Sequence, residues 1–385
     1  MSEAFAARSH LSTRLTAGVR LLGGLLVVAS FGKPSMATDS IPDPLALLRG
    51  VEDARQTCKS GRFEFQVKTT YPLKPTRTPR KIRLLASFDG TSRRFDAYQR
   101  VVIERSSSTA AALEQDRLLK SMGGNLEAYV RAGHGEFKEE HRRSAYDGTQ
   151  FLEYSEEKGA VIKDLTKGSP SFVFDPRVLG LSVYFDINYQ THTCLAYEGA
   201  KSIENLGKEV IDGLPCWQVK VIDSYDQDRR FWIEDNDSFR VLKCSFAVGP
   251  QKLETVSDYD SQVSQWALPR KVVNRKFDAS GQVSQVIEIT ATKTEYNVAV
   301  DSRLFSLAGL GMPLGEMVID DRLHSVVGHF DGKNLSENFS DAVQKGRDSQ
   351  RRPFLWISAL VGLIALATIG AVIARRRNFF REGAS

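Results

Sequence analysis

The sequence predicts a mainly β (α+β) protein built on an antiparallel sheet, with one helix before the sheet, helical inserts and one transmembrane helix near the C-terminus. Three observations lead to this prediction. The chain starts with a segment typical of an export signal, its middle alternates apolar and polar residues, and an uncharged apolar run comes shortly before its end. Alternation with a period of two is the pattern of a strand that buries one face. Short polar turns between such strands favour antiparallel neighbours.

The first 37 residues have the three parts of a secretory signal. Basic residues precede an uncharged apolar run over 21–32, and small residues occupy 35–37, where a signal peptidase cleaves. As a helix the apolar run reaches only about 18 Å, short of the roughly 30 Å hydrocarbon core of a bilayer. We therefore expect cleavage after Ala37 rather than an uncleaved anchor.

Residues 353–374 form an uncharged apolar run that ends at three consecutive arginines. A helix of this length spans about 33 Å, enough to cross a membrane with a slight tilt. The larger number of arginines after the run predicts a cytoplasmic tail over 375–385. We expect 331–352 to be a polar linker. The exported domain then covers 38–330 and lies outside the cell membrane, in a periplasm or in the extracellular space.

The formal net charge of +5 does not indicate nucleic-acid binding, because the excess lies at the two ends of the chain. The signal and the tail each hold four basic residues and one acid, so the exported domain is close to neutral. A domain that binds nucleic acid carries a basic patch or stripe. Nucleic acid is therefore excluded as a partner.

The exported domain is predicted to begin with a helix over 44–59, where apolar residues recur at helical spacing. Alternation at Phe63, Phe65 and Val67 then predicts the first strand. A polar, helix-permissive run over 106–124 predicts a helical or lid-like excursion. The other predicted strands cover 81–88, 93–104, 135–146, 151–154 and 160–164, followed by a meander that begins at Cys216 and includes 231–233, 239–246, 255–259, 268–277 and 283–297.

All four cysteines lie in the exported part, where thiols tend to be oxidised. Four cysteines allow three pairings, and the sequence does not choose among them. We expect at least two to pair in a disulfide, including Cys216 or Cys244. The four candidates are Cys58, Cys194, Cys216 and Cys244.

The order of helix and strands resembles the opening of the LolA/LolB-like superfamily, periplasmic lipoprotein-sorting proteins and their relatives. Residues 47–67 carry the resemblance of helix and first strand, 147–154 look like the family's recurring hairpin, and 212–221 with 231–234 look like its later paired strands. The similarity extends over 43–307. It implies a curved half-barrel sheet, closed on its open side by helices, with an apolar cavity for acyl chains.

No catalytic, cofactor or metal motif is found in the sequence: it has no GxSxG, HExxH or P-loop pattern. His134, Glu136, Glu139, Glu140 and His141 could supply metal ligands, but such a cluster is more often solvated charge. We therefore expect no enzyme activity, no cofactor and no metal site.

Large apolar side chains at alternate positions define one face of the predicted sheet. If that face lines a ligand pocket, Phe65, Trp217, Val219 and Phe231 are the candidate lining residues. The alternative is a solid core without a cavity, and the sequence does not decide between the two.

These observations predict a membrane-anchored, single-pass binding module for a lipid, an acylated protein or another apolar ligand, without catalysis. The alternative is an envelope sensor whose domain recruits a protein partner at the membrane. The tail of eleven residues after 374 is too short for a folded signalling domain, so a sensor would need such a partner.

Overall fold

The computed structural model describes residues 41–104, 116–157, 159–163, 175–181, 197, 199–249, 251–260 and 268–348. The predicted signal, transmembrane run and tail lie outside these residues. Within them, no helix is long and apolar enough to cross a membrane.

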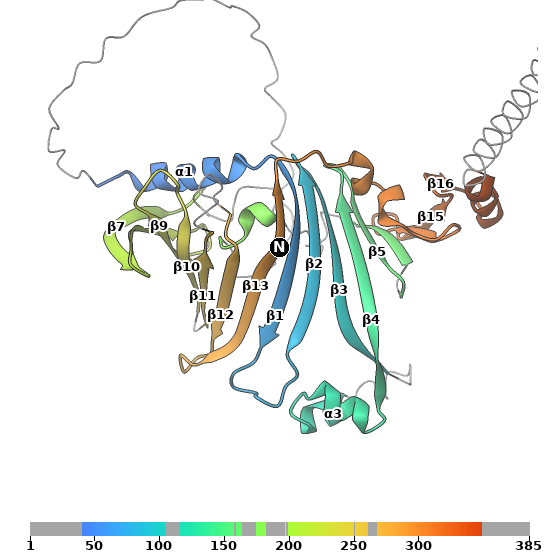
Figure 1. Cartoon of the computed structure of the whole chain (residues 1–385), viewed down its shortest axis with the longest axis horizontal. Helices are drawn as coiled ribbons and strands as arrows, with labels where there is room; N and C mark the ends of the chain where they lie inside the picture. The colour runs from blue at the N-terminus through green and yellow to red at the C-terminus, as the bar shows by residue number, and fades with distance from the viewer. Residues whose placement is uncertain are drawn as a thin grey trace, which may run out of the picture. The chain divides into compact units, whose positions relative to one another are not determined.

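In this part of the chain, sixteen strands form one sheet in the order β16-β15-β14-β6-β5-β4-β3-β2-β1-β13-β12-β11-β10-β9-β8-β7 (Figure 1). Neighbours pair antiparallel, apart from β14, which runs parallel to β6. The prediction of a mainly β fold with an open curved sheet and few helices is confirmed. The strands are β1 (Ser60–Thr70), β2 (Arg80–Asp89), β3 (Ser92–Glu104), β4 (Gly135–Tyr146), β5 (Phe151–Ser155), β6 (Gly159–Lys163), β7 (Ser202–Ile211), β8 (Leu214–Ile222), β9 (Asp228–Glu234), β10 (Val241–Val248), β11 (Gln251–Asp258), β12 (Lys271–Phe277), β13 (Val283–Tyr296), β14 (Met317–Asp320), β15 (Ser325–Phe330) and β16 (Leu335–Ser336).

The middle of the sheet follows the predicted alternation. In β1, Phe63, Phe65 and Val67 are buried on one face, and the polar residues between them point to the other. Val67 lies opposite Ile289 of β13, so the first strand of the domain pairs with its last long strand. This pairing joins the two halves of the sheet into one structure.

Helix α1 (Pro44–Gln56) covers the β7–β10 half of the sheet (Figure 1). The Asp43 side chain accepts from the backbone N–H groups of Leu45 and Ala46, which caps the helix and satisfies donors that its first turn leaves unpaired. Its apolar stripe packs on the strands in one buried cluster. The members of that cluster are Leu47, Leu48, Val51, Leu181, Trp217, Val219, Val221, Phe231, Ile233, Val241 and Cys244.

Segment 175–181, which includes the 3-10 helix η1 (Pro176–Val178), packs on the same face near the middle of the sheet. Arg55 of α1 donates to the carbonyl oxygens of Leu179 and Arg177 at 2.9 and 3.2 Å. Asp175 accepts from Arg177 at 2.8 Å and lies 3.4 Å from the guanidinium of Arg93. Burial raises the pKa of Asp175, but the two guanidiniums outweigh it and hold that pKa below its ordinary value.

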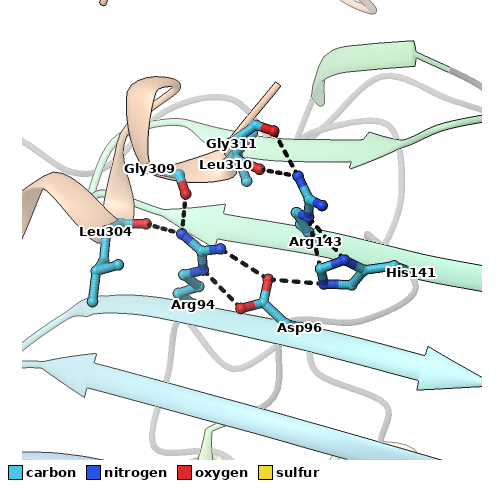
Figure 2. Close-up of polar contacts among 8 residues, drawn as sticks. All are labelled: Arg94, Asp96, His141, Arg143, Leu304, Gly309, Leu310 and Gly311. Atoms are coloured by element: carbon cyan, nitrogen blue, oxygen red, sulfur yellow. Dashed lines mark hydrogen bonds and ion pairs between the residues drawn. The ribbon is translucent and has the colours of Figure 1, made fainter. Parts of the chain in front are cut away.

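The opposite face of β4–β6 is covered by the segment that contains η3 (Ser302–Phe305) and η4 (Ala308–Leu310), and β14 follows it as the sheet neighbour of β6. Figure 2 shows how two arginines of the sheet hold this segment. Arg143 donates to the carbonyl oxygens of Leu310 and Gly311, both at 2.7 Å, and Arg94 donates to those of Leu304 and Gly309. The guanidiniums thus satisfy carbonyls that short helices leave unpaired at their C-terminal ends.

Strands β14 and β15 were not predicted, and two further segments differ from the sequence-based prediction. Strand β7 was not predicted, because most of its residues are at least partly exposed and the alternation is weak. The segment 331–352, predicted as a polar linker, contains β16 and a helical stretch over 339–348. The predicted helical excursion over 106–124 is helical at 116–121, and α3 (Leu126–Arg131) follows; the earlier residues of the excursion lie outside the described part of the chain.

The predicted disulfide is not found among the described residues. Cys58, Cys216 and Cys244 carry free, buried thiols, and Cys194 lies outside the described residues. The three thiols belong to three separate buried clusters, one of which, around Cys216, also contains Trp232. Since each cysteine packs as a small apolar residue in a different place, no two of the three form a bond.

Candidate ligand-binding groove

A groove of about 1220 Å³ opens at the end of the sheet where α3 lies. Figure 1 shows α3 below the lower ends of β2–β4. The groove is lined by the 71–79 loop between β1 and β2, by residues of the 116–129 segment, and by the adjoining ends of β2, β3 and β4. We call this the β3–β4 groove. The lining residues come from four separate stretches of the sequence, 71–81, 99–102, 116–129 and 137–142, so the fold brings them together.

Backbone contacts fix the walls of the groove relative to one another. The Thr78 N–H donates to the carbonyl oxygen of Gly124 at 3.2 Å, and the Thr78 hydroxyl accepts from the Leu126 N–H at 2.9 Å. Thr76 donates to the carbonyl oxygen of Gly123 at 3.2 Å. Gly123 and Gly124 both have left-handed φ angles, +66° and +78°, which favour glycine and let the chain turn tightly into α3.

The walls of the groove contain many apolar side chains. Leu73 is 45% exposed. Exposed apolar side chains that lie together in one patch commonly mark a binding site. Val101, Leu119, Leu126 and Phe137 line the same space. The groove therefore offers apolar surface to a ligand.

The charges on the groove are predominantly basic. Three acids line it, Asp116, Glu127 and Glu140. The basic residues outnumber them, and they are Lys74, Arg77, Arg80, Lys81, Arg100, Lys120 and Arg142. Since residues 38–374 as a whole are close to neutral, this excess is a local feature of the groove.

A chain of polar contacts crosses the sheet at the inner end of the groove. Gln99, which is 5% exposed, accepts from Arg80 at 3.1 Å and donates to Glu140. Glu140 in turn accepts from Arg142 at 2.6 Å. The buried amide and carboxylate are thereby satisfied, as groups away from water must be.

Beyond these polar residues, a small cavity of about 40 Å³ continues over the same face of the sheet. Arg80, Gln99 and Arg142 line both spaces. The apolar residues of the cavity are Val67, Ile82, Leu84, Phe95 and Ala97. At this volume the cavity has room for about one or two water molecules, so it would have to widen to receive an acyl chain.

The four residues predicted to line a pocket are buried in the core of the sheet. Trp217, Val219 and Phe231 share the cluster beneath α1, and Phe65 belongs to the neighbouring cluster around Phe63 and Phe88. None of the four lines the groove or the small cavity. The groove was not predicted, because its basic residues come from four segments with no common motif.

No group of three or more histidine, cysteine, aspartate or glutamate side chains in the described part of the chain could hold a metal ion. The His134 ring lies tilted beside Tyr129, with ring centroids 5.2 Å apart, and His141 stacks on Tyr98 at 4.0 Å. Burial raises the pKa of Cys58 and of Cys216 to about 11 and that of Cys244 to about 12. These thiols are therefore protonated at neutral pH and are poor nucleophiles.

No family model matches this chain, and no curated protein matches it. Several solved structures do. A DUF1329 family protein from Desulfovibrio piger is 12% identical, with 70% of this chain and 100% of that chain covered at a TM-score of 0.42. A LolA superfamily protein from Nitrosomonas europaea is 10% identical, with 69% and 99% covered at 0.40. An outer membrane lipoprotein-sorting protein domain from Vibrio parahaemolyticus is 9% identical, with 70% and 100% covered at 0.42. The second of these structures carries the name of the superfamily that the sequence resemblance gave, and at these identities the likeness concerns the fold alone.

Proposed function

We propose that the domain is a non-catalytic binding module, which holds a lipid, an acylated protein or another apolar ligand in the β3–β4 groove at a membrane surface. The observation that carries this proposal is the groove itself, an open space of about 1220 Å³ with apolar side chains on its walls. Pockets for small molecules commonly measure roughly 300–1,000 Å³ and are lined mainly by apolar groups. The groove has the size and the surface for such a ligand.

The apolar face beneath α1 is the weaker candidate for the binding site. Val219 and Ile233 are completely buried there, and Phe231 is 2% exposed. Side chains of the helix and the strands fill this space, so a ligand would have to displace α1. The groove needs no such displacement.

A substitution that fills the groove tests the proposal. Val101 is partly buried and lines the groove, so Val101→Trp places an indole in the open space. We expect the variant to fold and to retain several-fold less co-purified lipid than the wild type. Lipid is measured by extraction and mass spectrometry of the full chain, purified from the same membranes.

The matched control is Val326→Trp, the same substitution at a 49% exposed position of β15, outside the groove. This variant should keep the wild-type amount of lipid. Equal lipid in all three proteins, or no lipid in any of them, would contradict binding in the groove. A lowered unfolding temperature in Val101→Trp alone would instead indicate damage to the fold, and Val101→Leu would then be the test.

A further inference from the structure

Resting on this proposed function, we infer that the ligand of the β3–β4 groove is a lipid with an anionic headgroup, and that the basic side chains of the groove select it. The headgroup lies among the lysines and arginines of the 71–81 segment and β3, and the acyl chains lie on the apolar walls. The basic side chains define the headgroup of the ligand, which apolar surface alone does not.

Four basic side chains of the groove have neither an ion pair nor a side-chain hydrogen bond among the described residues, whereas Arg80 donates to the Gln99 amide. The four come from the β1–β2 loop, from β2 and from β3. By contrast, Arg142 pairs with Glu140 and Lys120 with Asp116, so those charges are already neutralised. The four are Lys74, Arg77, Lys81 and Arg100.

Two of these four are held in place by aromatic rings. The Arg77 guanidinium lies 3.7 Å from the ring centroid of Tyr71, and that of Arg100 lies 3.6 Å from the centroid of Phe137. Stacking on a ring face leaves the N–H edges of a guanidinium available for a planar or tetrahedral oxyanion. The two groups are therefore oriented before an anion binds, which lowers the entropy lost on binding.

The position of the apolar residues favours a lipid over a free anion. Leu73 is adjacent to Lys74, and Phe137 lies beneath Arg100. A free phosphate would use the charges and leave this apolar surface in contact with water. An amphiphile covers it, and each buried methylene contributes about 0.8 kcal/mol.

The experiment compares two lipids that share the same acyl chains, phosphatidylglycerol and phosphatidylcholine. The full chain is purified in dodecyl maltoside, both lipids are added in equal amounts, and native mass spectrometry counts the bound molecules of each. We expect phosphatidylglycerol to be bound preferentially. A parallel sample with inorganic phosphate in place of lipid tests binding of the free anion.

The groove variant combines Lys74→Gln, Lys81→Gln and Arg100→Gln, which removes three charges from exposed side chains. We expect its preference for phosphatidylglycerol to fall about tenfold, the change expected when three exposed ion pairs are lost. The control variant combines Lys59→Gln, Lys68→Gln and Lys333→Gln, exposed lysines outside the groove, and should keep the wild-type preference. Both variants retain the arginines that flank residues 353–374, so lipid bound there cancels in the comparison.

Each outcome bears on a different statement. Equal binding of the two lipids, both sensitive to Val101→Trp, would overturn the selectivity and leave the groove as a general lipid site. An unchanged preference for phosphatidylglycerol in the groove variant would show that the basic residues that select the headgroup are not those of the groove. Inorganic phosphate bound in place of lipid would make the groove an anion site. Absence of both lipids would remove the proposed function together with this inference.

Discussion

Val219 illustrates why alternating apolar residues do not distinguish a ligand pocket from a core. Its side chain is 0% exposed, and it packs among Val51 of α1 and Phe231 of β9. The sequence pattern indicates only that this face of the strand is buried. Whether a helix or a ligand covers the face depends on residues such as Val51, 168 positions away in the chain, and no local pattern contains that information.

Replacing Val219 by phenylalanine tests whether this cluster is a filled core. We expect Val219→Phe to lower the free energy of unfolding by about 1–3 kcal/mol, because the added ring overpacks a space that is already full. The measurement is urea unfolding followed by tryptophan fluorescence. Val326→Phe, at a 49% exposed site, should change stability by less than about 0.5 kcal/mol. A stable Val219→Phe protein that has lost bound lipid would move the binding site from the groove to the face beneath α1.

Among the elements, those that alternate strongly were predicted with nearly correct bounds. Strands β2 and β3 begin and end within one residue of the prediction, because every second side chain along them is buried or partly buried on one face of the sheet. Strand β7 and β16 escaped prediction since both lie at edges of the sheet, where one neighbour and partial exposure impose little pattern. The groove escaped prediction for a related reason, as the loop over 71–79 and α3 come together only in the fold.

The contact between β4 and the C-terminal segment contains a titratable group that the sequence did not single out for this role. His141 accepts from Arg143 at 3.1 Å, and its Nε2 lies 3.8 Å from Asp96, which also pairs with Arg94 (Figure 2). Burial lowers the pKa of His141, and Arg143 and Arg94 lower it further, while Asp96 and Glu156 oppose them. The neutral ring is therefore the form that fits between the two arginines.

This arrangement predicts a loss of stability in mild acid. Below the ordinary histidine pKa the unfolded chain binds a proton that folded His141 does not, so the free energy of unfolding falls as the pH decreases from about 6.5 toward the lower folded pKa. Above that window His141 contributes no pH dependence. We expect His141→Gln to show a weaker fall than the wild type when urea unfolding is measured from about pH 8 to about pH 5. Carboxylates that titrate in this range change the free energy of unfolding of both proteins, so their effect cancels when the two pH profiles are subtracted. Identical profiles would show that protonation of His141 does not disturb the contact with residues 301–311.

At the scale of the whole sheet, three buried clusters follow one another along sixteen strands, and paired strands connect them without interruption in the described part of the chain. The long pairing of β1 with β13 lies between the two halves. Because the backbone hydrogen bonds continue across this pairing, we expect the halves to unfold together rather than in turn.

Alkylation of the buried thiols tests directly whether the two halves of the sheet unfold together. Cys58 lies near the middle of the sheet, whereas Cys216 and Cys244 lie in the β7–β10 half on opposite faces, and burial keeps all three protonated at neutral pH. We expect all three to resist alkylation in the native protein and to become reactive over the same range of urea concentration, since a thiol reacts only when it is exposed and ionised. Pulsed alkylation followed by peptide mass spectrometry measures each site separately, and a Cys58→Ser variant controls for effects of one label on the others. If Cys216 and Cys244 react at a lower urea concentration than Cys58, the β7–β10 half opens by itself, and the sheet is then two cooperative units joined at β1 and β13.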